Sequence, residues 1–224
     1  MNETWALVPV KSPERSKTRL SSVLQPQECA MLSRAMFMDV LAALDAADGI
    51  THIAVLTSDT EVTALASQLG HEVIPDKPDS QLCDSLNNAA QHIADVGADS
   101  MLVIPGDIPT VLSVDIEQLL KSHAGGLSLC PAIRDGGTNA IICSPPNAMP
   151  FQFGEDSAQR HIEMAEQCGL NIERLPMQAF FRDIDTPDDL VWLSRQTSGG
   201  NTVRFLRQSG IFARLGPGLA GASA

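Results

Sequence analysis

Short apolar segments alternate along the chain with longer segments in which apolar residues recur every three or four positions. In the first long segment Cys29, Leu32, Met36, Val40 and Leu44 follow that period, which predicts one buried face of a helix. The same pattern predicts helices at residues 26–48, 61–69, 84–96, 113–123, 157–168 and 188–195. The short apolar runs predict strands at residues 5–10, 53–56, 72–74, 101–104, 127–132, 139–143 and 171–175.

The alternation of strands and helices predicts the fold class. Parallel strands joined by helices are buried on both faces, which fits the continuous apolar runs at 53–56 and 101–104. We therefore expect an α/β fold: a single-domain, three-layer α/β/α structure around a Rossmann-like, mostly parallel sheet. The sequence contains no internal repeat, so we expect one domain over residues 1–212 and a flexible C-terminal tail over 213–224, where Gly, Ala and Ser are frequent.

Charge and composition exclude several classes of protein. The chain has 27 Asp and Glu against 15 Lys and Arg, a net charge of −12, which argues against binding to duplex nucleic acid or to anionic membranes. Neither a membrane-spanning apolar run nor a signal peptide is apparent, so we expect a cytoplasmic protein. The five cysteines are widely spaced and form no CxxC pair, so we expect reduced thiols rather than a zinc site.

Basic residues cluster directly after the first expected strand. Lys11, Arg15, Lys17 and Arg19 lie within nine residues, in a segment that leads into a helix. Open α/β sheets bind ligands at the carboxyl ends of their strands, and these side chains are suited to a polyphosphate. The alternative is a solvated basic loop. The glycines and the GK[ST] signature of a P-loop are absent, so side chains would contribute more than the backbone to phosphate binding.

Acidic residues occur in two later segments, one directly after the strand 101–104 and one at residues 183–189. Asp107 comes just after strand 101–104, between a Gly and an Ile-Pro pair, and a metal ligand is favoured there over a turn residue. Asp183 and Asp185 alternate along the chain, so they face the same side if the segment is extended. Residues 186–189 (Thr-Pro-Asp-Asp) read as the start of a helix with the Thr as N-cap. Asp107 with Asp185 would form a site of oxygen ligands suited to Mg²⁺ on a nucleotide.

Two further segments are candidates for contact with a small anion. Residues 134–139 (RDGGTN) contain a Gly pair that permits close approach to a ligand, although a hairpin turn explains it equally well. The loop 144–156 has no periodicity and is expected to lie at the active site. Ser157 is the expected N-cap of the next helix, and Arg160 and His161 lie one turn further on, where an anion could bind. For the other histidines a structural role is favoured over a functional one, and three are expected at the surface: His52, His71 and His123.

Taken together, these motifs resemble one known family, the guanylyltransferases of coenzyme F420 biosynthesis, which include 2-phospho-L-lactate guanylyltransferase and its bacterial relatives. The similarity runs from residue 5 to about residue 195. It rests on Trp5 with VPVK (8–11), SKTRL (16–20), LTSD (56–59), PGDIP (105–109), DGGTNA (135–140), FGEDS with RH (153–161) and DIDTPDDL (183–190). Ser85-Leu86-Asn87 stands where Gly-Leu-Asn is expected near the nucleotide.

The resemblance implies a fold similar to nucleotide-diphospho-sugar transferases and to molybdenum-cofactor guanylyltransferases. It implies attack of a phosphorylated three-carbon acid (3-phospho-D-glycerate, phosphoenolpyruvate or 2-phospho-L-lactate) on the α-phosphorus of GTP, with release of pyrophosphate. A homodimer is a further implication. The alternatives are another acceptor, such as a sugar phosphate or molybdopterin, or a non-catalytic nucleotide-binding module.

The resemblance also implies roles for individual residues. Metal ligation of Mg²⁺ is expected from Asp107 and Asp185. Catalysis and triphosphate binding are expected from Lys11, Lys17 and Arg19, with Asn87 as a further nucleotide contact. Contacts to the acid substrate are expected from Thr138, Gly154 and Ser157.

Overall fold

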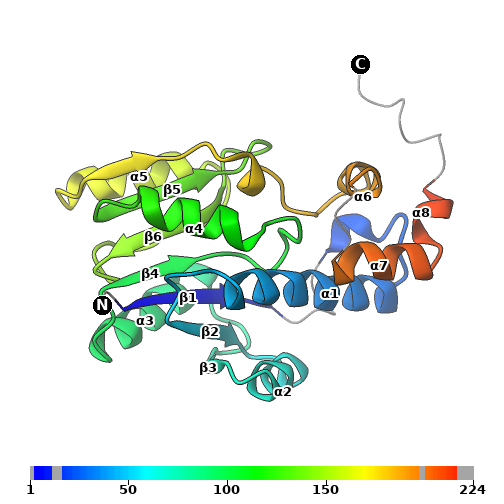
Figure 1. Ribbon diagram of the computed structural model, residues 1–224, viewed down its shortest axis with the longest axis horizontal. Coiled ribbons are helices and arrows are strands. Elements are labelled where there is room, and N and C mark those ends of the chain that lie inside the picture. The colour runs from blue at the N-terminus through cyan, green and yellow to red at the C-terminus, as the bar shows by residue number, and fades with distance from the viewer. Residues whose placement is uncertain (1–2, 12–16, 197–199, 216–224) are drawn as a thin grey trace.

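Seven strands form one mixed sheet in the order β3-β2-β1-β4-β6-β5-β7, and only β6 runs against the others (Figure 1). The computed structural model describes residues 3–11, 17–196 and 200–215. The strands are β1 (Thr4–Pro9), β2 (His52–Thr57), β3 (Glu72–Pro75), β4 (Ser100–Val103), β5 (Gly126–Pro131), β6 (Thr138–Ser144) and β7 (Ile172–Arg174). The predicted α/β class is confirmed: a parallel sheet that acquires one antiparallel strand through the β5–β6 hairpin.

Helices cover both faces of the sheet and create a hydrophobic core on each. The first core is built with α1 (Pro26–Asp45), α2 (Thr60–Gln68) and α4 (Ser113–Ser122), the second with α3 (Leu82–Asp95) and α5 (Ser157–Gln167). The apolar period of α1 explains its position, because Leu32, Met36, Val40 and Leu44 are all buried. These bounds agree with the predicted helices to within three residues at each end.

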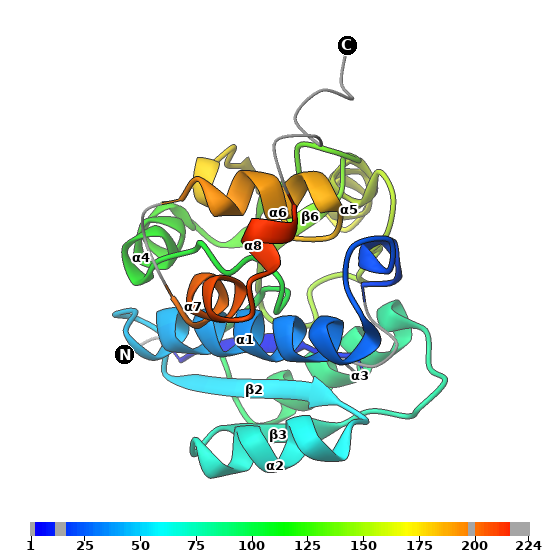
Figure 2. The same ribbon diagram turned by 90° about the vertical axis from the view of Figure 1, so that its right-hand side faces the viewer.

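A third hydrophobic cluster joins the start of α1 to the C-terminal helices (Figure 2). These are α6 (Pro187–Ser194), α7 (Asn201–Gln208) and α8 (Ile211–Arg214). The last two were not predicted. The Asp39 carboxylate of α1 accepts the backbone N–H groups of Asn201 and Thr202 at 2.6 and 2.8 Å, so α7 is capped by a residue 162 positions away. The predicted boundary at residue 212 falls inside α8, residues 216–224 lie outside the described residues, and the division into domain and tail stays a prediction.

Two of the histidines expected at the surface are not exposed. The His71 side chain is only 7% exposed and lies 3.5 Å from Asp45. His123 is half-buried because its two ring nitrogens contact the hydroxyls of Ser128 and Ser144, each at 2.8 Å. Both predictions were wrong because these contacts come from residues whose positions only the fold determines.

The described cysteines are all free thiols. Cys29, Cys130 and Cys143 fill the core, and burial raises the pKa of Cys130 and Cys143 to about 12. Such thiols stay protonated and pack as small apolar groups. In the part of the chain that the structure describes, we find no helix with both the length and the apolarity needed to cross a bilayer.

Candidate active site at the carboxyl ends of the strands

Three hollows meet at the carboxyl end of β1, around Val10. One pocket of about 290 Å³ is lined by Lys11 and Lys17 together with Asp107 and Asp185, so it brings two of the three candidate bases and both candidate metal ligands to one place. Each of these side chains follows a buried strand or sits in a loop at the same edge of the sheet, as the topology requires.

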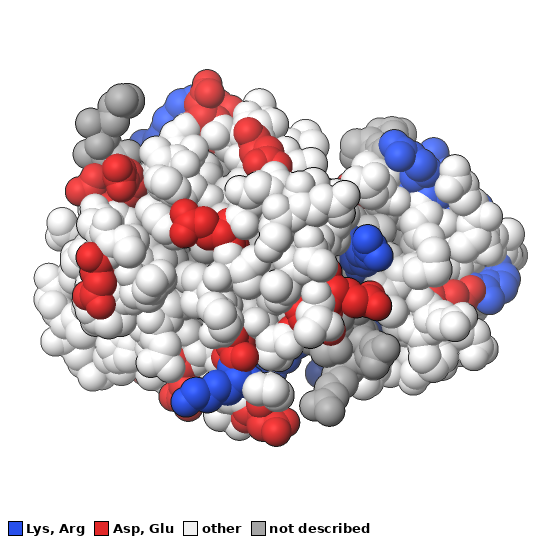
Figure 3. Space-filling model, turned by 90° about the horizontal axis from the view of Figure 1, so that it is seen from below, with Lys and Arg blue, Asp and Glu red and all other residues white. Residues whose placement is uncertain are grey.

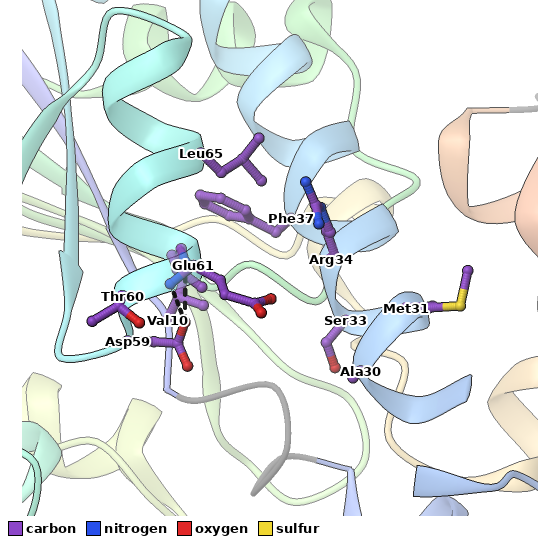
Figure 4. A pocket seen from close by; sticks show the side chains of 11 residues that line it. Val10, Ala30, Met31, Ser33, Arg34, Phe37, Asp59, Thr60, Glu61 and Leu65 are labelled. Carbon is purple, nitrogen blue, oxygen red and sulfur yellow. Dashed lines mark hydrogen bonds between the residues drawn. The ribbon is translucent and has the colours of Figure 1, made fainter. Parts of the chain in front are cut away.

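The second hollow, of about 350 Å³, lies between α1 and α2 (Figure 4). Asp59 and Glu61 line one side and Arg34 the other, and Asp59 caps α2 by accepting the N–H groups of Glu61 and Val62. The space-filling view shows a hollow between the body of the molecule and a smaller lobe, with acidic and basic side chains along it (Figure 3).

The third hollow, of about 650 Å³, runs from Lys11 to the loop after β3. In this loop Asp76 Oδ1 accepts the hydroxyls of Ser80 and Ser85, each at 2.6 Å. Burial alone would raise the pKa of Asp76, but these hydrogen bonds outweigh it and hold the pKa below its usual value. A glycine was expected at position 85 from the family resemblance, and the Ser85 hydroxyl present there helps to hold this loop through Asp76.

Lys17 is the centre of the charged cluster. Its ammonium donates to Asp107 at 2.6 Å and to Asp185 at 3.4 Å, and its side chain is only 6% exposed. Burial alone would lower the pKa of Lys17, but the charges of Asp107, Asp185 and Asp183 raise it overall, so the ammonium stays charged. Arg19 reaches the same Asp185 at 3.1 Å from a more exposed position.

One oxygen of this cluster has no donor. Asp107 Oδ1 is buried, and no described residue donates a hydrogen bond to it. Asp183 lies nearby, and burial together with the charge of Asp107 raises the pKa of Asp183. A buried carboxylate oxygen without a partner is costly. Asp107 and Asp185 share the Lys17 ammonium, and the metal-ligand role expected for these two carboxylates stays a prediction.

Asp189 is a second buried acidic centre, and its role was missed. The sequence reading gave it only a place in the first turn of α6, where it does accept the N–H of Thr186 at 2.7 Å. The fully buried carboxylate also binds Arg134 and, at 2.9 Å, Arg182, and it accepts the N–H of Asp185 at 3.1 Å. Asp189 therefore ties the loop before β6 to the loop that carries Asp185.

A neutral cluster occupies the space between β6 and α5. Thr138, Ser157 and His161 are all buried, and the Thr138 hydroxyl oxygen lies 3.1 Å from Ser157 Oγ and 3.0 Å from His161 Nδ1. Burial, assisted by the charge of Arg160, lowers the pKa of His161 to about 4, so the ring is neutral at pH 7. Two of the three residues expected to contact the acid are thus in direct contact.

The start of α5 differs from the prediction. The N-cap is Asp156, which has a φ of 53°, and Ser157 is the first helical residue, so the expected N-cap role of Ser157 was wrong. Its hydroxyl is used by Thr138 instead. The N–H groups of Ser157 and Ala158 donate to the carbonyls of Gly154 and Gly136, so these two are not open to an anion.

The other predicted substrate and nucleotide residues lie around this cluster. Gly154 has a φ of 123°, which favours glycine, and Arg160 holds its loop by donating to the Glu155 carbonyl at 2.6 Å. Asn87 of α3 accepts the N–H of Phe151 at 2.8 Å and so also supports the loop 144–156. Asn87 therefore supports the loop beside the neutral cluster, and the nucleotide role expected for it stays a prediction.

Loop 134–137 connects the charged and the neutral clusters. Arg134 at one end binds Asp189, and Asp135 O accepts the N–H of Asp156 at 3.0 Å. Gly136 has a φ of 64°, which favours glycine, and a Cβ there would lie 2.8 Å from Asp156 Oδ1, so a larger residue would also displace that side chain. The RDGGTN segment thus joins the two clusters.

The sheet order and the helices on both faces define an α/β fold like that of the nucleotide-diphospho-sugar transferases. A protein from Desulfovibrio desulfuricans G20 assigned to the nucleotide-diphospho-sugar transferases has the same fold, with a TM-score of 0.78 and 22% identity over 96% of this chain and 99% of its own.

The family is established by sequence. The family described as "Guanylyl transferase CofC like" matches residues 4–218, and the chain belongs to it. The chain is 37% identical to the phosphoenolpyruvate guanylyltransferase of Roseiflexus sp. (strain RS-1), over 90% of each protein. It is 32% identical both to the 3-phospho-D-glycerate guanylyltransferase of Colwellia psychrerythraea (87% of this chain, 93% of the relative) and to the 2-phospho-L-lactate guanylyltransferase of Methanothermobacter thermautotrophicus (92% and 91%).

Proposed function

We propose that this guanylyltransferase transfers GMP from GTP to the phosphate of a phosphorylated three-carbon acid and releases pyrophosphate, as a step of coenzyme F420 biosynthesis. The relatives support the class of acceptor, since the substrates in their names (phosphoenolpyruvate, 3-phospho-D-glycerate and 2-phospho-L-lactate) are all three-carbon carboxylic acids that carry one phosphate. The observation that carries the proposal is the buried Lys17 ammonium held between Asp107 and Asp185 beside nucleotide-sized hollows.

Asp107 and Asp185 fit a Mg²⁺ site. Two observations support this part of the proposal: Asp107 has an oxygen without a hydrogen-bond partner, and both carboxylates already share the Lys17 cation. When bound, Mg²⁺ supplies charge neutralisation on the triphosphate. Carboxylate oxygens match this ion rather than zinc.

The bases of the site account for the rest of the chemistry. In the proposal Lys11, Lys17 and Arg19 bind the triphosphate and stabilise the charge that moves onto the leaving pyrophosphate. The attacking phosphate of the acid already carries about −1.5 to −2 charges at neutral pH, so no general base is needed. The obstacle is repulsion between two anions, and a basic segment beside the cleft lowers it.

The decisive experiment is an acceptor panel. The chain is incubated with GTP, Mg²⁺ and each of the three acids, pyrophosphate is followed, and the product is identified by mass. We expect guanylylation of at least one acid. Reaction only with a sugar phosphate or molybdopterin would contradict the acceptor class. GTP binding that raises the melting temperature without pyrophosphate release would indicate a non-catalytic module.

A pair of lysine variants links that activity to the site. Lys17→Met should lower turnover strongly because it removes the buried ammonium. The matched control is Lys121→Met, which removes a lysine that is 75% exposed on α4 and should have no effect. Equal activities of the two variants would exclude the role proposed for Lys17. The homodimer implied by the family resemblance stays a prediction, which light scattering on the purified chain measures.

A further inference from the structure

The hydrogen atoms of the neutral cluster can be assigned from its partners. The backbone N–H of Gln152 donates to His161 Nε2 at 2.9 Å, so Nε2 carries no proton. A neutral imidazole has its proton on the other nitrogen, and His161 Nδ1 is therefore the donor in the 3.0 Å contact with Thr138 Oγ1.

Thr138 then has one proton left to donate. Its hydroxyl oxygen accepts from His161 and also from Ser157 Oγ at 3.1 Å, which fills both of its acceptor positions. Among the described residues no acceptor lies within hydrogen-bond distance of this hydroxyl besides these two donors. The cluster is thus a chain of donors that ends in the O–H of Thr138.

We propose that His161 is a positioning residue for recognition of the acid: together with Ser157 it fixes the Thr138 hydroxyl as a hydrogen-bond donor to the carboxylate or phosphate of the acid substrate. This inference rests on the proposed function, since it takes the acid to bind beside Thr138. It adds His161, which is fully buried and would act on the acid only through Thr138.

The arrangement suits recognition of an anion. Donors that accept hydrogen bonds themselves are polarised and donate more strongly, and hydrogen bonds to charged oxygens are shorter and stronger than neutral ones. A neutral His161 also keeps its direction of donation over the physiological pH range, because burial lowers its pKa to about 4. The Thr138 hydroxyl therefore needs no rearrangement when the acid binds.

A purely structural role for His161 is the competing explanation, because its ring also holds the loop 144–156. It accepts the N–H of Gln152 and packs edge-on against Phe151 and Phe153, with ring centroids 6.2 and 5.0 Å away. Two substitutions separate the roles. His161→Asn places an amide N–H near the position of Nδ1 but loses the acceptor for Gln152. His161→Gln places an amide oxygen near the position of Nε2 but loses the donor to Thr138.

The test measures KM for the acid, KM for GTP and kcat in both variants, with the exposed His92→Gln on α3 as the matched control. We expect His161→Gln to raise KM for the acid by about tenfold, the effect of about one hydrogen bond, with KM for GTP unchanged. His161→Asn should rescue KM for the acid to within about threefold of the wild type, although it is the variant that loosens the loop. If instead KM for the acid rises more in His161→Asn than in His161→Gln, the proposal is overturned, and the role of His161 is to support the loop 144–156.

A double-mutant cycle and a spectrum complete the test. In a Thr138→Val background His161→Gln should no longer change KM for the acid, because the hydroxyl it positions is gone; additive effects would overturn the proposal. Proton–nitrogen correlation spectra should show His161 protonated on Nδ1, and protonation on Nε2 would contradict it. If the wild type guanylylates no acid, the proposed function and this inference are both refuted. If the wild type is active but the His161 variants have an unchanged KM for the acid, this inference alone is refuted.

Discussion

The charged and neutral halves of the site are built in opposite ways. Around Lys17 the side chains of Asp107 and Asp185 are 29% and 27% exposed, carry net negative charge and include a buried oxygen without a partner. Thr138, Ser157 and His161 are buried and uncharged, and among their side-chain protons only that of the Thr138 hydroxyl has no acceptor in the described part of the protein. The difference indicates that the charged half needs a ligand to complete its interactions, whereas the hydrogen bonds of the neutral half are already formed without one.

This contrast matches the two substrates. A nucleotide triphosphate with a metal ion brings a large charge, which is best met by side chains that can change partners. A small acid brings few atoms, so its binding and orientation depend on donors that are already fixed. Asp189 and loop 134–137 join the halves, so we expect the positions of the two substrates to be coupled through one buried carboxylate.

The largest effect should come from the charged half. Asp107→Asn should reduce kcat by about 10³-fold or more, because it removes a charge on which both the metal and Lys17 depend. The melting temperature should change little, and Asp188→Asn, at an exposed position of α6, is the control. Activity within tenfold of the wild type would exclude Asp107 as a metal ligand.

The next effect is a pH dependence of stability that belongs to the neutral half. The pKa of His161 is lowered by burial to about 4 from 6.5, so between these values the unfolded chain binds a proton that the folded chain does not. Stability should therefore fall as the pH drops from 6.5 to 4, by about 1.4 kcal/mol per pH unit and up to about 3 kcal/mol in total. Burial lowers the pKa of His123 as well, which adds a slope of the same sign.

Urea denaturation at several pH values measures this slope. His161→Gln should make it shallower, although the variant is less stable at pH 7, and His92→Gln should leave it unchanged. An unaltered slope in His161→Gln would mean that the ring is accessible to protons in the folded state, against the buried neutral cluster described above.

Asp189→Asn tests the connection between the halves. Loss of the carboxylate leaves Arg134 and Arg182 without their partner, but these side chains are 34% and 38% exposed. We therefore expect a loss of about 2 kcal/mol in the free energy of unfolding, below the cost of breaking a fully buried pair. Both KM values should rise together, and a change in only one of them would show that Asp189 does not couple the two halves.

The smallest effect should be seen away from both halves. Asp39→Ala removes the carboxylate that caps α7 and should cost about 1 kcal/mol, as for a lost N-cap, with kcat unchanged. Denaturation and steady-state kinetics on the same preparation measure both quantities. A fall in kcat that accompanies the loss of stability would show that the C-terminal helices contribute to catalysis, contrary to this prediction.

The fold and the charged half were largely predictable from the sequence. The recurrence of apolar residues in α1 and the apolar runs of the strands can be recognised from neighbouring residues alone. Lys11, Asp107 and Asp185 can be recognised because each is a charged residue that directly follows a buried or extended segment. Their meeting at one edge follows from the rule that ligands bind at the carboxyl ends of parallel strands.

The parts that escaped prediction depend on distant partners. Asp189 reads as an ordinary residue of a first helical turn until the fold brings Arg134, 55 positions away, against it. The α7 helix depends on Asp39, which lies in α1. Ser157 was assigned a capping role because its actual partner, Thr138, lies in strand β6, outside the helix that Ser157 begins. In each case the deciding contact joins segments that are far apart in the sequence, so local patterns carry no record of it.

The most direct test of the two-part site is to measure Mg·GTP affinity and the KM for the acid in the same two variants. Asp107→Asn should weaken Mg·GTP binding by about tenfold or more. Thr138→Val should leave that affinity within about twofold while it raises KM for the acid by about tenfold. If Thr138→Val weakens Mg·GTP binding as much as Asp107→Asn does, the assignment of GTP to one half and the acid to the other is wrong.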